Sequence, residues 1–129
     1  MILDTNVLVR LEREHQRRMN GPATQFLTKN ASERFFITPT TIGEFGCGQS
    51  MAERGKWEEA LAIFEFLPLD REVSWIYGEI YRHLASQGKL IGVNDLWIAA
   101  TALRHDVPVA TGNVREFERV PGLRVISVC

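Results

Sequence analysis

Three short apolar segments of this chain each run into polar side chains. The pairs are residues 1–3 with Asp4, residues 35–37 with Glu44 a few positions later, and residues 108–110 with Thr111. Short apolar runs separated by helical patterns are typical of strands in a buried parallel sheet. The carboxyl ends of parallel strands meet at one edge of the sheet, where ligands bind. We therefore expect these polar side chains to converge in space.

Residues 57–64 have the spacing of an amphipathic helix, with apolar residues at i, i+3, i+4 and i+7. Residues 94–104 are apolar nearly all round, as expected for a helix buried against a sheet. Helices are predicted over residues 7–19, from Pro22 onward, over 57–64, 73–84 and 94–104, and from Val114. Gly88 is placed to end the fourth of these in a left-handed cap. A last strand is predicted over residues 123–128, and none between residues 41 and 87. Strands alternating with helices indicate an α/β fold with a mainly parallel central sheet. Without repeats or a linker, we expect one domain over residues 1–129.

The formal charge of −1 argues against nucleic-acid binding by bulk charge, so any such binding requires a local patch. One candidate follows the first strand, where basic residues alternate with other polar ones. The basic residues are Arg10, Arg13, Arg17 and Arg18, with Glu12, Glu14 and His15 among them. This stretch is either a solvated face of mixed charge or a surface that faces phosphates.

Membrane and secretion signals are missing from the sequence. It has no apolar run of about 18 residues, and no basic region precedes the first apolar segment. Two cysteines, Cys47 and Cys129, are too few for a disulfide framework or a zinc site. We expect free thiols, a cytoplasmic location and no membrane partner.

Each polar candidate also has a structural explanation as a helix cap. In chain order, Asp4 caps the first helix, Thr41-Ile42-Gly43-Glu44 matches a capping box, Asn94 is an N-cap followed by Asp95, and Asn113 is an N-cap with Glu116 three residues later. Capping needs only a short polar group, and Ser or Thr would serve. It does not explain carboxylates at Asp4, Glu44 and Asp95. Like charges brought together cost stability unless a cation offsets them, so the set favours a hard divalent cation.

The ordered set of motifs resembles the PIN domain, and within it the VapC-type toxin ribonucleases of bacterial and archaeal toxin–antitoxin systems. The matching segments are Asp4-Thr5-Asn6, Glu44 within Thr-Ile-Gly-Glu, residues 92–102 and residues 111–117. The resemblance covers the whole chain in order. Residues 92–123 are its most specific part.

The resemblance implies a small α/β/α sandwich and an endoribonuclease that depends on Mg²⁺ or Mn²⁺. It assigns Asp4, Glu44 and Asp95 to the acidic triad. In such a site we expect Asp4 and Asp95 on the metal, and Glu44 either as general base or bound to the metal through a water molecule. It further implies an RNA substrate, a VapB-like antitoxin that covers the active site, and a homodimer.

The departure from the family pattern is at Asn113, where many PIN domains have a fourth acid. Asn113 could ligate through its carbonyl oxygen or orient a water, and Glu116 is the other candidate for the missing charge. By the same resemblance, Thr5 and Asn6 support the acids, and Thr111 contacts the metal-bound water network or the substrate.

Two alternatives stay open on the sequence alone. A PIN-fold binding module without turnover fits the missing fourth acid and the near-neutral charge. A phosphate-transferring enzyme or receiver domain that uses Asp4 fits less well, because the Asp-x-Asp and late lysine patterns are missing. The histidines are scattered on polar faces, and we expect them at the surface: His15, His83 and His105.

Overall fold

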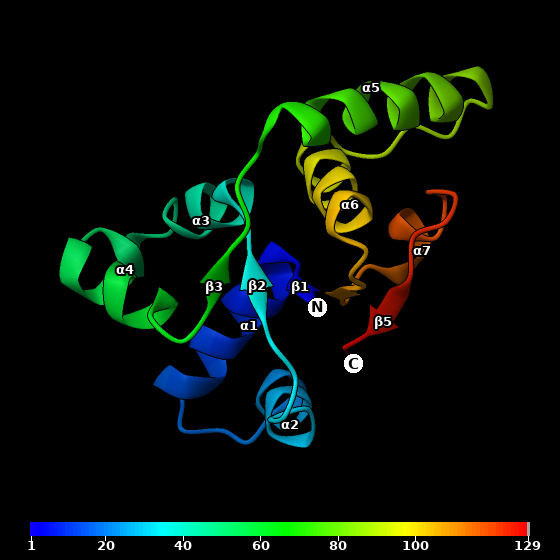
Figure 1. Cartoon of the computed structure of the whole chain (residues 1–129). Helices are drawn as coiled ribbons and strands as arrows, with labels where there is room; N and C mark the ends of the chain where they lie inside the picture. The colour runs from blue at the N-terminus through cyan, green and yellow to red at the C-terminus, as the bar shows by residue number, and fades with distance from the viewer. Residues whose placement is uncertain (129) are drawn as a thin grey trace.

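The computed structural model describes residues 1–128, which form an all-parallel five-stranded sheet with helices on both faces (Figure 1). The strand order is β3-β2-β1-β4-β5. The strands are β1 (Ile2–Leu3), β2 (Phe36–Ile37), β3 (Glu65–Phe66), β4 (Val109–Thr111) and β5 (Val125–Ser127). The predicted α/β class is confirmed, and the sheet is wholly rather than mainly parallel.

Seven α-helices and one 3₁₀ helix are found within residues 1–128. They are α1 (Thr5–Gln16), α2 (Pro22–Lys29), α3 (Pro39–Phe45), η1 (Gln49–Met51), α4 (Arg54–Leu61), α5 (Arg71–Ser86), α6 (Val93–His105) and α7 (Val114–Phe117). In this part of the chain, no helix is both long and apolar enough to cross a membrane. Cys47 is an exposed free thiol as expected, whereas Cys129 lies outside the described residues.

Neighbouring side chains of a strand belong to two separate hydrophobic cores, one on each face of the sheet. Ile2 and Val109 belong to the core shared with α5, α6 and α7, whereas Leu3 and Ala110 belong to the core shared with α1 to α4. This follows from the two-residue period of a strand, which points neighbouring side chains to opposite faces. A strand covered on both faces has to be apolar at every position, which explains the uninterrupted apolar runs of the sequence.

The chain reverses its direction of travel across the sheet at β1. From β1 it moves outward to β2 and β3, and it then returns to place β4 on the other side of β1. In open parallel sheets, such a switch point leaves a crevice at the carboxyl ends of the two central strands. Asp4 follows β1 and Thr111 ends β4, so both lie at this crevice.

The prediction that no strand lies between residues 41 and 87 was wrong, because β3 occupies Glu65–Phe66. It pairs with β2 in register, Phe36 opposite Glu65 and Ile37 opposite Phe66. Both residues of β3 are exposed at the edge of the sheet. One of its two residues is the charged Glu65, so β3 lacks the uninterrupted apolar run by which the other strands were found.

Helix starts differ from several of the predicted caps. Asp4 does cap α1, which therefore begins at Thr5. The α3 helix is instead capped by Thr38, whose hydroxyl accepts the Thr41 N–H at 3.4 Å, so the proposed capping box of Thr41 and Glu44 was wrong. Asn94 is not a cap either, because α6 begins one residue earlier, at Val93.

Two side chains expected at the surface are at least partly buried. His105 is half-buried, and among residues 1–128 its Nε2 atom has no hydrogen-bond partner. Glu14 is 5% exposed and accepts hydrogen bonds from the backbone N–H groups of Ala23 (3.1 Å) and Thr24 (2.8 Å) at the start of α2. Gly88 has φ 64° just after α5, which confirms the predicted left-handed cap.

Candidate active site

The crevice at the carboxyl edge of the sheet is a cavity of about 470 Å³. Most of the side chains singled out in the sequence line it: Asp4, Thr5, Asn6, Glu44, Asp95 and Asn113. They come from the ends of β1 and β4 and from α1, α3 and α6. The expected convergence of residues distant in sequence is therefore found, and it follows from the parallel topology.

Asp4 is buried, and both of its carboxylate oxygens accept a hydrogen bond. Oδ1 accepts the N–H of Thr5 at 2.7 Å, and Oδ2 accepts the hydroxyl of Thr111 at 2.7 Å. Burial raises the pKa of Asp4 and outweighs these two bonds, and the negative charges of Glu44 and Glu116 raise it further. The pair of bonds fixes the carboxylate while its charge stays uncompensated.

Asp95 lies in the first turn of α6 and is half-buried. Burial is the main cause that raises its pKa to about 8, followed by a hydrogen bond with Glu116 and the charges of Asp4, Glu116 and Glu44. In the absence of a cation, burial and the neighbouring carboxylates therefore disfavour the ionised form of Asp95. A positive ion beside it would reverse the shift, because opposite charge favours the ionised form.

Glu44 lies near the end of α3, and its carboxylate is hydrogen-bonded to a residue of another helix. Its Oε1 atom accepts the Thr5 hydroxyl at 2.6 Å, a bond between α1 and α3. Thr5 thus donates its N–H to Asp4 and its hydroxyl to Glu44, and it sets the relative positions of the two carboxylates.

Asn113 and Glu116 form one unit at the start of α7. The side-chain amide of Asn113 donates to Glu116 Oε2 at 2.8 Å, and its backbone N–H donates to the Thr111 hydroxyl oxygen at 2.8 Å. Asn113 occupies the N-cap position of α7 but makes no side-chain cap bond. A hydrogen-bonded chain therefore runs from Asp4 through Thr111 and Asn113 to Glu116.

Asn6 fastens the loop after β4 to α1. Its Oδ1 atom accepts the N–H of Gly112 at 3.3 Å. Arg10, one turn further along α1, donates from Nη1 to the carbonyl oxygen of Val128 at 3.2 Å. Arg10, Arg13 and Val9 also line the cavity. The arginines were among the sequence candidates, whereas Val9 carried no signal in the sequence.

The donor set suits a hard divalent cation that keeps part of its water shell. Mg²⁺ commonly takes one or two protein carboxylates and completes its shell with water and phosphate oxygens. Asp4 and Asp95 are two such carboxylates, with charges that repel each other. Among residues 1–128, however, no group of three or more His, Cys, Asp or Glu side chains is close enough to hold an ion together. A third carboxylate would thus act through water.

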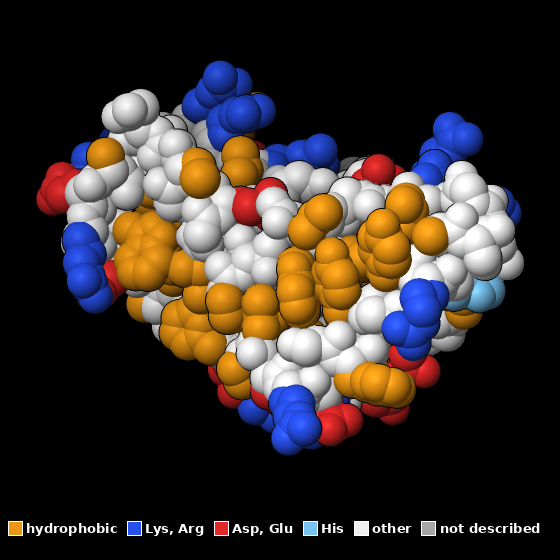
Figure 2. Space-filling view, turned by 90° about the horizontal axis from the view of Figure 1, so that it is seen from above, with side chains coloured by type: hydrophobic (Ala, Val, Ile, Leu, Met, Phe, Trp, Pro, Cys, Tyr) orange, Lys and Arg blue, Asp and Glu red, His pale blue; other side chains and the backbone are white. Residues whose placement is uncertain are grey.

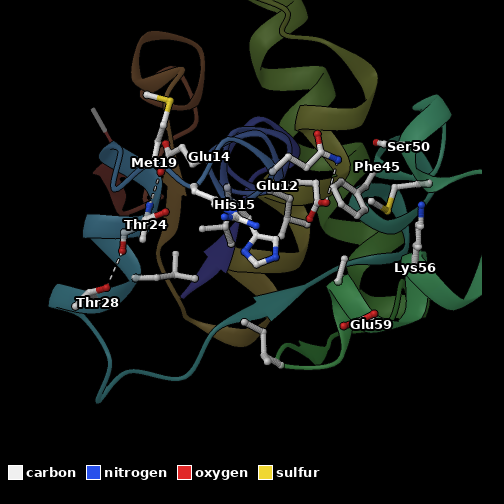
Figure 3. Close-up of a pocket in the computed structure, with 18 residues that line it drawn as sticks. Glu12, Glu14, His15, Met19, Thr24, Thr28, Phe45, Ser50, Lys56 and Glu59 are labelled. Atoms are coloured by element: carbon white, nitrogen blue, oxygen red, sulfur yellow. Dashed lines mark hydrogen bonds between the residues drawn. The ribbon is translucent and has the colours of Figure 1, made fainter.

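A second, larger cavity of about 1010 Å³ lies apart from these carboxylates, between α1, α2 and α4 (Figure 3). Its walls are largely apolar, with Leu11, Leu27 and Phe45 among them, and polar side chains such as Lys56 and Glu59 lie along it. None of the acidic-site residues lines this cavity.

A parallel sheet in this order, with carboxylates gathered at its carboxyl edge, defines a PIN-like α/β protein. Residues 1–123 match the family model described as PIN domain. A protein named Ribonuclease VapC from Rickettsia bellii is 30% identical over 136 residues, which cover 99% of this chain and 96% of that protein. The chain belongs to the PIN-domain family and, within it, to the VapC ribonucleases.

Two further relatives come from Salmonella typhimurium. One, named tRNA(fMet)-specific endonuclease VapC, is 32% identical over 103 residues, 76% of this chain and 78% of that protein. The other is the crystal structure of a DNA-bound VapBC. One of its chains superposes with a TM-score of 0.81 at 29% identity, over 99% of this chain and 97% of that one.

Proposed function

We propose that this chain is an endoribonuclease that hydrolyses RNA phosphodiester bonds with Mg²⁺ or Mn²⁺. We further propose that it is the toxin of a VapBC-like toxin–antitoxin module in the cytoplasm, acting as one domain over residues 1–129. The observation that carries this proposal is the cavity shared by Asp4, Glu44 and Asp95, in which the pKa values of Asp4 and Asp95 are raised. A cation is what such a cluster lacks.

Asp4 and Asp95 would hold the ion, because both lie in the cavity and their mutual repulsion is relieved by positive charge. A divalent cation bound there polarises the scissile phosphate and lowers the pKa of a water molecule. The Thr111 hydroxyl keeps Asp4 in one orientation, so that an oxygen lone pair can point into the cavity.

Glu44 is the proposed general base, since Thr5 holds one of its oxygens and orients the carboxylate. It would accept the proton of the attacking water directly or through one further water. Asn113 is proposed to orient that water or to ligate the ion through its side-chain oxygen. Its amide group is already donated to Glu116, which fixes the direction of the oxygen.

The proposed partner is a VapB-like antitoxin, and the cavity between α1, α2 and α4 supports it. An apolar floor with a charged rim is the surface that an amphipathic segment fills. Ile63, 73% exposed at this cavity, would become buried by such a segment. A partner seated here could also cover the acidic cavity, where an arginine would replace the cation.

A homodimer is also proposed, on the basis of apolar side chains exposed near α5. Seen from above, the molecule carries a band of apolar side chains with few charges across its middle (Figure 2). Trp75 and Tyr81 of α5 are 64% and 45% exposed, and Val93 at the start of α6 is 60% exposed. Contiguous exposed apolar surface of this kind marks protein–protein contacts.

A binding module without turnover is the second candidate. It is favoured by Asn113 in place of a fourth acid and by the separation of the carboxylates among residues 1–128. Such a protein would bind RNA or the antitoxin but would not cleave RNA in the presence of a metal.

The deciding experiment is cleavage of total RNA by antitoxin-free protein with Mg²⁺ or Mn²⁺, and then with EDTA. Wild type should give discrete fragments that disappear with EDTA and with Asp4→Asn, Glu44→Gln or Asp95→Asn. Asp106→Asn is the matched control, because Asp106 is exposed at the far end of α6. Metal-dependent cleavage that survives both Asp4→Asn and Asp95→Asn contradicts the assignment. Absence of cleavage by folded wild type favours the binding module.

A further inference from the structure

Arg10 and Arg13 lie in α1, and Arg17 follows directly as the C-cap residue of this helix. Arg10, Arg13 and Arg17 are spaced i, i+3 and i+7, which places them on the same side of a helix. The acids that alternate with them in sequence do not share their role. Glu14 is buried against the start of α2, and Glu12 accepts a hydrogen bond from Gln16 at 3.2 Å. Glu12 nevertheless stays close to Arg13 and Arg17, since the three side chains line one hollow, and the arginines therefore form a basic stripe with one acid beside it.

This stripe begins inside the acidic cavity and leads away from it. Arg10 and Arg13 line the cavity that holds Asp4 and Asp95. Arg13 and Arg17 line a neighbouring hollow of about 260 Å³ between α1, α3 and η1. The two hollows share Val9, Arg13 and Glu44, so they adjoin each other along these residues.

The three guanidinium groups are not held in direct ion pairs within the described residues, although the charge of Arg10 helps to lower the pKa of Glu14. Among residues 1–128, none of them forms an ion pair with an aspartate or glutamate within 4.0 Å; the five ion pairs found there involve other residues. Arg10 is held by its bond to the Val128 carbonyl oxygen, and one of its nitrogens lies 3.5 Å from the position of a Cβ on Gly112. It therefore lies beside the loop that carries Asn113, and all three arginines are exposed.

Resting on the proposed ribonuclease function, we infer that the RNA backbone runs along this face of α1. In this arrangement, Arg10 and Arg13 bind the phosphates next to the scissile one, and Arg17 binds a phosphate further along the strand. Arginine suits this role because its planar fork donates two hydrogen bonds to a phosphate. The acidic cavity alone would repel RNA, and the stripe supplies the attraction that a chain of net charge −1 lacks.

The arginines are positioning residues, because they act on phosphates other than the reacting one. Contacts to phosphates set the register of the strand but do not read its bases. Their removal should therefore weaken RNA binding and raise KM, while kcat with saturating RNA changes little. It should also reduce the salt dependence of binding, because a variant that contacts fewer phosphates releases fewer counterions when it binds RNA.

The experiment measures binding of a labelled single-stranded RNA to full-length protein carrying Asp95→Asn, which keeps the RNA intact, across a series of salt concentrations. In this background, Arg13→Gln and Arg17→Gln should each weaken binding by about 3–10-fold and reduce the slope of log K against log salt by about 0.7. The matched control is Arg71→Gln, since Arg71 is exposed on α5 and lines neither hollow.

Unchanged affinity and slope in Arg13→Gln and Arg17→Gln overturn the inference. Unchanged RNA binding together with weakened antitoxin binding also overturns it and assigns the stripe to the protein partner. The outcomes for the proposed function are separate. If wild type cleaves RNA but the arginine variants bind RNA as wild type does, the ribonuclease function is supported and the proposed RNA path is contradicted. If RNA binding depends on the arginines but wild type does not cleave RNA, the RNA path is supported and the nuclease function is contradicted.

Discussion

The hydroxyl of Thr111 donates a 2.7 Å hydrogen bond to Oδ2 of Asp4, a contact between residues 107 positions apart. It exists because β4 pairs directly with β1, with Leu3 opposite Ala110, so that the residues following this pair lie side by side. Both side chains are buried. One bond therefore connects the end of one central strand to the end of the other and orients the carboxylate most deeply placed in the site.

Replacing Thr111 by Val should remove this donor while keeping the shape of the side chain. The buried Asp4 carboxylate would lose one of its two hydrogen bonds, so the free energy of unfolding should fall by about 1–3 kcal/mol. RNA cleavage should fall by about 10–100-fold, as is usual when the group that orients a metal ligand is lost. Urea unfolding and cleavage rates measure the two effects. Thr111→Ser keeps the hydroxyl and should retain most of the activity; equal losses in Ser and Val variants would contradict this role.

Asp95 should make the metal-free protein less stable as pH rises. Its folded pKa of about 8 lies above its ordinary value of 3.8, so the folded state binds the proton more tightly than the unfolded state. Its contribution to stability is therefore lost progressively between these two pH values. In EDTA at pH 8, Asp95→Asn should be more stable than wild type by about 1–3 kcal/mol, because it removes one charge from a repelling cluster.

Thermal unfolding in EDTA at several pH values measures this difference between Asp95→Asn and wild type. The difference should shrink as pH falls toward 4 and should also shrink when Mg²⁺ is added at pH 8. An advantage of Asp95→Asn that stays constant with pH would mean that repulsion among ionised carboxylates is not its cause.

Glu14 should stabilise the protein only above its folded pKa. Burial acts to raise the pKa of Glu14, but hydrogen bonds from Thr24 and Ala23 outweigh it and hold the pKa below its ordinary value of 4.5. The stabilisation is therefore fully present above pH 4.5 and is lost as pH falls through the folded pKa. Glu14→Gln should lower the free energy of unfolding at pH 7 by about 1–3 kcal/mol, since a buried charged acceptor of two N–H groups is lost. Urea unfolding at pH 7 and pH 3 checks this, and the loss should be smaller at pH 3.

Gly21 and Gly43 offer a matched pair of alanine substitutions. A Cβ on Gly21 would lie 2.4 Å from the carboxyl carbon of Glu14, whereas a Cβ on Gly43 meets no atom within 4 Å. Gly21→Ala should destabilise the protein, because the carboxylate can move only by breaking its bonds to α2. Gly43→Ala in α3 should stabilise it by about 0.5–1 kcal/mol, the usual gain from replacing glycine within a helix. Urea unfolding of both variants at pH 7 tests the pair; a stable Gly21→Ala variant would show that Glu14 is free to shift.

Ile63→Glu should weaken binding of the proposed antitoxin without unfolding the chain. Ile63 is 73% exposed, so a charged side chain there is solvated in the free protein. In a complex that fills the α1–α2–α4 cavity, the same charge would be buried without a partner, and affinity should fall at least about tenfold. Calorimetric titration with the cognate antitoxin measures the change, with Leu90→Glu as the control, since Leu90 is 44% exposed and lies outside the cavity. Equal affinity of wild type and Ile63→Glu would place the antitoxin elsewhere.

The strands β1, β2 and β4 were predictable because each is an apolar run that ends in a polar residue. A strand buried on both faces requires such a run, so the signal is local. Asp4 as a cap of α1 and Gly88 as a left-handed cap were also predictable, since capping depends on neighbouring residues alone. The edge strand β3 was not, because its pairing with β2 is set by partners distant in sequence.

Local sequence could not decide between a cap and a site residue. Glu44 matched a capping box, yet its carboxylate bonds to Thr5 on another helix. Glu14 looked like part of a solvated face, yet it is buried under α2. Its spacing from Val7 and Leu11, both on the inner side of α1, was the available signal. A carboxylate has many equivalent local partners, and only packing selects among them.

The sequence by itself determined the alternation of strands and helices, and with it the edge at which Asp4, Glu44 and Asp95 meet. That information is carried by the period and length of apolar runs, which depend on burial and not on particular contacts. The tertiary structure decided the protonation and orientation of these groups. It joined Thr111 to Asp4, placed Glu116 beside Asp95, and buried Glu14 under α2 while Arg13 and Arg17 stay exposed. Hydrogen bonds and charge interactions act over a few ångströms, so they depend on which distant segments the fold brings together.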